Sequence, residues 1–271
     1  MTAEELNQAL VDKCEKFHNA THEWLMKQSP EEILNHADTF WTEERIIAHL
    51  KEHPLPEEQA KALLTAFAPL VDLALIYRNQ HEPESIGKCL ADTANKLAAE
   101  NQKRAQCPVY PNNAEYAREH NETEQYRASA KLNIQCCKDI QDAIRTNYDD
   151  NRLRSVAVHQ VVAKYGLDRT EYVLANTVQQ KSWDGRFSPA TKEWAAKFQI
   201  PEDKGILNDD RRYEFAVNSH PGLTNLFISL LRSQCPHKEQ QERPSVRAKL
   251  RAKPPIENGT NRSAHSKEPS R

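Results

Sequence analysis

The sequence is poor in glycine and methionine, with six glycines and two methionines among 271 residues. An all-β sandwich or barrel needs many tight turns and a phosphate loop needs clustered glycines, so this scarcity argues against both. No run approaches the roughly eighteen apolar residues of a transmembrane helix. The first thirty residues carry acidic and polar side chains throughout. We therefore expect no secretory signal and a cytoplasmic protein.

Charge is spread unevenly along the chain. Residues 1–107 hold 11 lysines and arginines against 18 acids, residues 108–235 hold 17 of each, and residues 236–271 hold 9 against 4. An acidic front, a neutral middle and a basic end are typical of an interaction protein.

The cysteines form no CxxC pair and are scattered along the chain, at Cys14, Cys89, Cys107, Cys136, Cys137 and Cys235. Because no export signal is expected, we predict free thiols and no disulfides.

Helical spacing of apolar residues predicts a mainly α protein. Thr2 and Glu5 form the pattern of a capping box before a first helix. The predicted apolar stripe of this helix is Leu6, Leu10, Phe17, Thr21, Trp24 and Leu25. Ser29 and Pro30 begin a second helix, with a predicted inner face of Ile33, Leu34, Ala37, Phe40 and Trp41.

Further helices follow from the same signals. They are expected after Pro56, after Pro69, around residues 86–97, over 122–148, over 156–165 with Gly166 as the end, after Asp168 as a cap, after Ser188–Pro189 and over 223–231. Residues 213–217 fit either a short strand or a helix.

The chain is predicted to form two small helical domains joined by a proline-containing linker. The prolines of Cys107–Pro111 interrupt helical structure and mark the boundary. The predicted parts are an acidic helical domain (1–80), a linker with one helix (81–111), a second helical domain (112–235) and a disordered basic tail (236–271).

The most informative local motif is Trp183-Asp184-Gly185-Arg186-Phe187. Its Asp-Gly pair favours a tight turn between helices. One interpretation is a binding loop, to which the preceding helix adds hydrogen bonds. The other is an interhelical turn whose aromatics enter the core and whose aspartate caps a backbone amide. On the first interpretation the binding residues are Asn176, Gln179, Lys181, Trp183, Asp184 and Arg186.

Signals for metal binding and catalysis are weak. Cys14, His18 and His22 lie four apart on the first helix, but they are expected to drift from the edge of its apolar stripe towards water and lack a fourth ligand. No nucleophile elbow or glycine-rich oxyanion turn accompanies the cysteines, and His220 favours a turn. We expect no enzyme, no metal, no cofactor and no small-molecule substrate.

The basic tail is a candidate nucleic-acid contact, through Lys238, Arg243, Arg247, Lys249, Arg251 and Lys253. Phosphate contacts by such residues give salt-dependent affinity without sequence preference. Aromatic residues for base stacking are missing, so binding would be weak. A soluble unstructured terminus is the alternative.

Several segments resemble two families known only as domains of unknown function. YVLANTVQQKSWDGRFSPATKEWA (172–195), CPVYPNNAEYAREHNETEQYRASAKLNI (107–134) and VNSHPGLTNLF (217–227) resemble a family found in Firmicutes of animal guts. ILNHA (33–37) and LPEEQAKALL (55–64) resemble a second family that is often fused to the first. The chain has Thr224-Asn225 where the first family's pattern has an acidic pair.

The resemblance implies that such proteins are encoded with the accessory genes of integrative and conjugative elements, and it supplies no catalytic residue. With the charge pattern, it favours a non-enzymatic accessory or adaptor protein of a bacterial mobile element that acts through protein–protein contacts. The alternative is a nucleic-acid-associated factor, or an inhibitor of a host defence nuclease, tethered by the basic tail.

Overall fold

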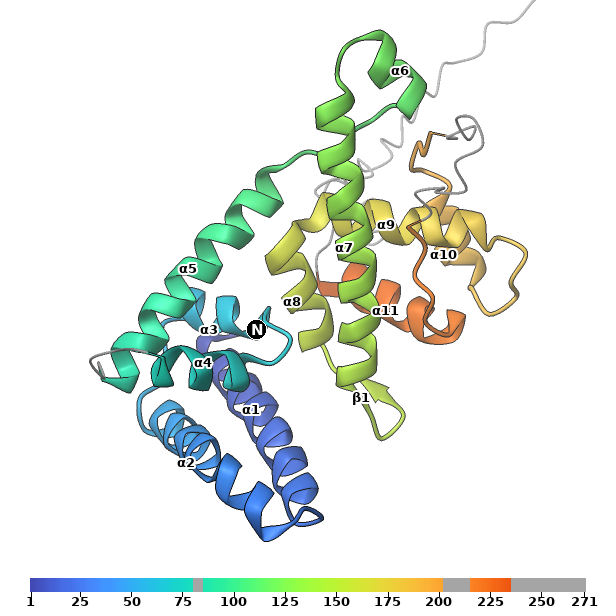
Figure 1. Cartoon of the computed structure of the whole chain (residues 1–271). Helices are drawn as coiled ribbons and strands as arrows, with labels where there is room; N and C mark the ends of the chain where they lie inside the picture. Colours follow the sequence, from blue (N-terminus) through green and yellow to red (C-terminus); the bar gives the residue numbers. More distant parts are fainter. Residues whose placement is uncertain (80–84, 202–214, 235–271) are drawn as a thin grey trace, which may run out of the picture. The chain divides into compact units, whose positions relative to one another are not determined.

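The computed structural model describes residues 1–79, 85–201 and 215–234. The described part is almost entirely helical (Figure 1), which confirms the predicted fold class. Its elements are α1 (Ala3–Leu25), α2 (Pro30–Glu52), α3 (Glu57–Leu64), α4 (Pro69–Arg78), α5 (Ile86–Gln106), α6 (Ala114–Glu119), α7 (Thr123–Asn147), β1 (Tyr148–Asp149), β2 (Arg152–Leu153), α8 (Val156–Tyr165), α9 (Leu167–Gln180), α10 (Pro189–Ala195) and α11 (Pro221–Gln234).

Several predicted helix ends are confirmed by their capping residues. Thr2 and Glu5 exchange the two hydrogen bonds of a capping box at the start of α1. Ser29 accepts a hydrogen bond from the Glu32 amide at the start of α2. At the end of α8, Gly166 adopts a φ of 80°.

Three local predictions are wrong or incomplete. Asp168 is not the cap of α9, because Gly166 lets that helix begin directly at Leu167. The helix α6 and the β1–β2 hairpin were not predicted. Asp150 and Asn151 have φ values of 46° and 60° between the strands, the left-handed conformation that a two-residue hairpin turn requires.

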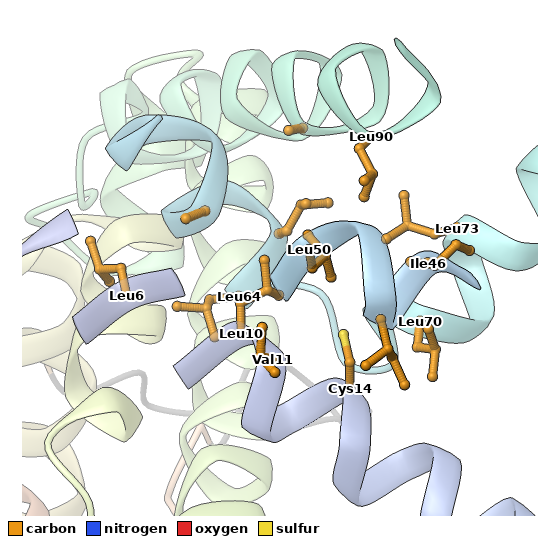
Figure 2. Packing of buried hydrophobic residues seen from close by; sticks show 14 of the residues in the cluster. Leu6, Leu10, Val11, Cys14, Ile46, Leu50, Leu64, Leu70, Leu73 and Leu90 are labelled. Atoms are coloured by element: carbon orange, nitrogen blue, oxygen red, sulfur yellow. The ribbon is translucent and has the colours of Figure 1, made fainter. Parts of the chain in front are cut away.

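The amino-terminal helices share one hydrophobic core (Figure 2). Leucines of α1 face leucines and isoleucines of α2, α3, α4 and α5. The cluster consists of Leu6, Leu10, Val11, Cys14, Ile46, Ile47, Leu50, Ala60, Leu63, Leu64, Leu70, Leu73, Ala74, Leu90, Ala94 and Val156. Its last member comes from α8, so this core extends beyond the first five helices.

No single described helix is both long and apolar enough to cross a membrane. The helices α3 and α4 pass such a test only as a pair, and the chain bends by 102° between them.

The predicted inner faces of α1 and α2 are only partly buried. Trp24 is 45% exposed, Leu34 76% and Trp41 63%, and Ile33 is also exposed. These four assignments are wrong. Both helices have 23 residues, whereas α3 has 8 and α4 has 10. The short helices therefore leave the C-terminal half of α1 and the N-terminal half of α2 with little besides each other to cover them.

A second group of buried residues joins α7, α8, α9, α10 and α11. Its larger members are Cys136, Ile140, Ile144, Val158, Val161, Val173, Leu174, Val178, Phe187, Trp194, Phe227, Ile228 and Leu231. Residues Met1–Gln234 make up one compact unit. The predicted domain limits at 80, 111 and 235 are not tested by this and stay predictions.

Arg169, on α9, is a buried cation that the sequence did not reveal, 1% exposed. Its guanidinium donates to the backbone oxygens of Cys107 and Pro108 and to Ser129 and Asn133 of α7. Burial lowers the Arg169 pKa. The guanidinium thus fastens the proline segment after α5 to α7 and α9.

Several predictions fall outside the described residues: the tail 236–271, Cys235, and the first part of the segment 213–217. The described part of the segment 213–217, residues 215–217, has no regular secondary structure.

Candidate functional site

The motif Trp183–Phe187 forms a compact turn between α9 and α10. The Asp184 amide donates to the Lys181 carbonyl, which carries the chain away from the end of α9. Phe187 is 2% exposed and enters the core. Ser188 then caps α10 by accepting a hydrogen bond from the Thr191 amide. Both ends of the turn are therefore fixed by the fold.

A buried carboxylate locks the inside of the turn. Asp184 is 4% exposed and accepts hydrogen bonds from the Arg186 side chain at 2.9 Å (Nε to Oδ1) and 2.6 Å (Nη2 to Oδ2). It also accepts the Arg186 backbone amide at 2.9 Å. These bonds lower the Asp184 pKa to about 2 and raise that of Arg186.

Arg186 also connects the turn to the segment before α11. Its Nη1 lies 3.1 Å from Nε2 of His220. The Gly222 amide lies 3.1 Å from the other ring nitrogen, Nδ1, and a neutral imidazole can accept only one of these two hydrogen bonds. His220 is thus a structural hydrogen-bond partner of the turn in this arrangement.

The outer edge of the turn is open to solvent. The Trp183 side chain is 79% exposed, the largest such fraction among the exposed large hydrophobic residues of the described part. A Cβ built on Gly185 would meet no atom within 4 Å. Half of the Arg186 side chain is exposed as well. Phe187 and Asp184 thus fit the interpretation of a structural turn between helices. Trp183, which faces solvent, fits the interpretation of a binding loop.

The polar candidates on α9 use their donors inside the fold. Asn176 donates to the Phe215 carbonyl at 2.9 Å and Lys181 to the Val217 carbonyl at 2.8 Å. Gln179 donates to the carbonyls of Ala195 and Phe198. These contacts hold the segment before α11 and the end of α10 beside α9. A binding role for these three residues stays a prediction.

Asn225 supports the same turn from α11. Its Oδ1 accepts the Ser188 amide at 3.1 Å and the Thr191 hydroxyl at 2.8 Å. The pair of contacts ties the start of α10 to α11.

Cys14, His18 and His22 do not form a cluster of ligands. Cys14 is fully buried, and burial raises its thiol pKa to about 12. His18 is 12% exposed and its Nδ1 lies 3.1 Å from the Glu43 carboxylate. The expected drift towards water is therefore wrong for His18. Within residues 1–79, 85–201 and 215–234, no three His, Cys, Asp or Glu side chains gather closely enough to hold a metal ion.

The other thiols belong mainly to the core. Cys14, Cys107, Cys136 and Cys137 are free, as predicted. Burial raises the pKa of the Cys136 thiol, and that of Cys137 to about 11. Such thiols are poor nucleophiles, because the thiolate is the reactive form.

One small polar cavity, of about 50 Å³, lies between α1, the end of α3, α7 and α8. Lys13 borders it and donates to the carbonyls of Leu64 and Ala66, at 3.0 and 2.6 Å. Burial lowers the Lys13 pKa to about 8. Across the cavity, Asp139 pairs with Lys164 and accepts the Tyr165 hydroxyl.

This space suits a few water molecules, and Lys13 caps the last carbonyl of α3 and that of Ala66 just after it. No spacing in the sequence distinguished Lys13 from other surface lysines.

Comparison with known families divides the chain into two adjacent regions. Residues 6–101 match the family model described as "Protein of unknown function (DUF3848)", and residues 109–236 match "Protein of unknown function (DUF3849)". This supports the predicted tandem of two uncharacterised families. No curated protein and no solved structure matches the chain.

Proposed function

We propose that this chain is a non-enzymatic adaptor that binds a protein partner through Trp183. The observation that carries the proposal is an almost fully exposed indole on a turn fixed from within by Asp184 and Arg186. Tryptophan and arginine are the residues most enriched among energetically dominant contacts at protein interfaces.

Rigidity of the turn supports a binding role. A loop that is ordered before binding loses less conformational entropy when a partner docks. The indole adds a large contact area with few rotatable bonds. The exposed half of Arg186 places a positive charge beside it, so the partner surface that fits is an apolar pocket with an acidic rim.

The biological setting is part of the proposal. The resemblance of 107–134, 172–195 and 217–227 to a family of gut Firmicutes favours an accessory role in an integrative or conjugative element. The composition favours a cytoplasmic location.

Site-specific photo-cross-linking tests the binding site. A photoreactive phenylalanine analogue replaces Trp183 in the full chain, at native expression in the producing cell. Met26, 70% exposed on a distant turn, is the matched control position. We expect a discrete cross-linked protein from position 183 and none from position 26. Equal yields at the two positions, or none at 183, would refute the proposal.

A second candidate function is nucleic-acid association through residues 236–271. The specific observation is their 9 basic against 4 acidic residues. Since contacts to phosphates are salt-dependent, the full chain should retard DNA at low salt and a chain ending at Cys235 should not. Equal retardation by both chains would exclude the tail as the contact.

A further inference from the structure

The helix α2 carries an apolar stripe that is open to solvent at its larger side chains. Ile33, Leu34, Ala37 and Trp41, here called the outer stripe, lie at helical positions i, i+1, i+4 and i+8, which fall on one side of a helix. Leu34 and Trp41 are 76% and 63% exposed.

The adjoining side of α2, which begins at Phe40, is used within the chain. Phe40 packs against the His18 ring of α1, with ring centres 4.3 Å apart. Ile46, Ile47 and Leu50 lie in the shared core. Figure 1 shows α1 and α2 side by side. Leu34 and Trp41 are therefore left largely uncovered beside the packed side of α2.

Grouped apolar side chains of this size mark an interaction surface more often than single ones do. The charges that flank the outer stripe indicate what kind of surface covers it. Glu31 lies in the first turn of α2, and Arg45 lies in its C-terminal half beside Glu44, which is 44% exposed and contacts His18 of α1 at 3.8 Å. Glu31 and Arg45 thus stand at opposite ends of the same stripe.

A second α2, packed antiparallel and centred on Ala37, complements this arrangement. In that register Ile33 and Leu34 face Trp41 of the second copy, and the small side chains of the two Ala37 residues meet where the helices cross. Arg45 then lies beside Glu31 of the second copy. Glu44 approaches the positive N-terminal end of the opposite helix. A parallel arrangement would instead place Glu31 against Glu31.

Both members of the proposed charge pair are available in the single chain. The Arg45 guanidinium lies 5.8 Å from the centre of the Tyr77 ring on α4. Among the described residues neither Arg45 nor Glu31 takes part in a salt bridge. Asp38, which also borders the stripe, is already paired with Arg78 at 2.8 Å.

We infer that the outer stripe is the contact of a twofold symmetric homodimer, in which two copies of α2 pack antiparallel. Because the same face of both chains makes this contact, two chains satisfy it completely and no third chain can add to it. One helix face on each side makes a small interface, which gives a weak, reversible dimer at the low end of specific associations. This inference is independent of the proposed role of Trp183.

Sedimentation velocity of the full chain over a wide concentration range tests the dimer. We expect a shift from monomer to dimer as concentration rises, and a dissociation constant about tenfold or more larger for Trp41→Ala. Trp183→Ala is the matched control, because it removes an even more exposed indole elsewhere. A chain that stays monomeric, or equal effects of the two substitutions, would overturn the inference.

A charge exchange tests the register. Arg45→Glu and Glu31→Arg should each weaken the dimer, and the double variant should restore it, since the pair is rebuilt with its signs reversed. Both sites are on the surface, so circular dichroism should show unchanged helicity in all three variants. If the double variant loses as much dimer affinity as the two single variants do together, the antiparallel register is contradicted.

A cross-link tests the centre of symmetry. Ala37→Cys, in a chain that also carries Cys107→Ser and Cys235→Ser, should form a disulfide-linked dimer under mild oxidation. Gln102→Cys on the exposed side of α5 is the control. Equal cross-linking at positions 37 and 102 would count against an interface at Ala37.

Discussion

Asp184 shows how one buried carboxylate can shape an exposed loop. The carboxylate lies two residues before the arginine that neutralises it, so the whole ion pair is local to the turn. Both carboxylate oxygens are used, and the backbone amide of Arg186 is fixed as well. The result is a turn whose interior is polar and satisfied while Trp183 remains outside.

The pH dependence of this carboxylate gives the first prediction. The Asp184 pKa is about 2 in the folded chain and near 3.8 when unfolded. Its contribution to stability is therefore complete above pH 3.8 and is lost as the pH falls towards 2. We expect Asp184→Asn to reduce the difference in unfolding midpoint between pH 5 and pH 2.5, measured by urea titration at both values.

Asp92→Asn is the control for this measurement, since Asp92 is exposed on α5. Its acid sensitivity should equal that of the unaltered chain. If Asp184→Asn shows the same acid sensitivity as Asp92→Asn, the ion pair contributes nothing to stability.

Lys13 has the opposite pH behaviour. Its pKa is about 8 in the folded chain against an ordinary 10.5. Between these values the folded chain binds fewer protons than the unfolded chain, so the contribution of Lys13 to stability rises with pH. We expect the unfolding free energy of the unaltered chain, relative to Lys13→Met, to rise by about 3 kcal/mol from pH 7.5 to pH 10.5.

Lys131→Met, at an exposed position of α7, supplies the reference for Lys13. Relative to this variant the unaltered chain should show no such rise. The comparison also removes the alkaline titration of the cysteine thiols, which all three proteins share. If the difference in unfolding free energy between the unaltered chain and Lys13→Met does not change with pH, the Lys13 ammonium remains well solvated in the folded chain.

At the scale of elements, Gly166 joins two helices without a loop. Its φ of 80° and ψ of 162° place it in a region that residues with a Cβ rarely occupy. A Cβ at this position would meet Ala105 no closer than 3.7 Å, so the cost of Gly166→Ala is confined to the backbone. We expect a loss of about 1–3 kcal/mol in unfolding free energy, measured by urea denaturation.

Gly185→Ala is the matched substitution, because a Cβ there would meet nothing within 4 Å. It should leave stability nearly unchanged. A similar loss for both glycines would show that the effect does not come from the backbone angle of Gly166.

Helices were predictable where local chemistry determines them. The capping residues Thr2, Ser29 and Ser188 act on amides within three residues, so the sequence itself contains their partners. The helix α6 has six residues, too few for an apolar period to appear. The turn of β1 and β2 depends on left-handed Asp150 and Asn151, which lack the glycine that usually marks such a turn.

Side-chain environments were harder to predict, because they depend on segments far apart in the sequence. Trp183 and Phe187 are aromatic residues of one motif, yet only Phe187 is buried. Arg169 resembles any surface arginine until α7 and the segment after α5 supply its acceptors. The stripe on α2 was correctly read as apolar but wrongly assigned to the core, since the shortness of α3 and α4 leaves it uncovered.

At the scale of the whole molecule, the two family regions are connected by specific contacts. Val156 of α8 belongs to the hydrophobic cluster of α1–α5. Lys16 donates to the Thr146 carbonyl at 3.2 Å, and Arg154 lies 3.6 Å from Asp12. Loss of either region would expose apolar surface of the other, and such shared burial favours unfolding in one step.

The distribution of tryptophan makes this coupling measurable, since Trp24 and Trp41 lie in the first region and Trp183 and Trp194 in the second. A chain with Trp24→Phe and Trp41→Phe reports fluorescence from the second region alone, and Trp183→Phe with Trp194→Phe reports the first. Each variant's fluorescence midpoint in urea is compared with the midpoint of its own helicity, measured by circular dichroism. The two midpoints should coincide within each chain. Separate midpoints would instead support two independently folding domains, with the boundary that the prolines after α5 predict.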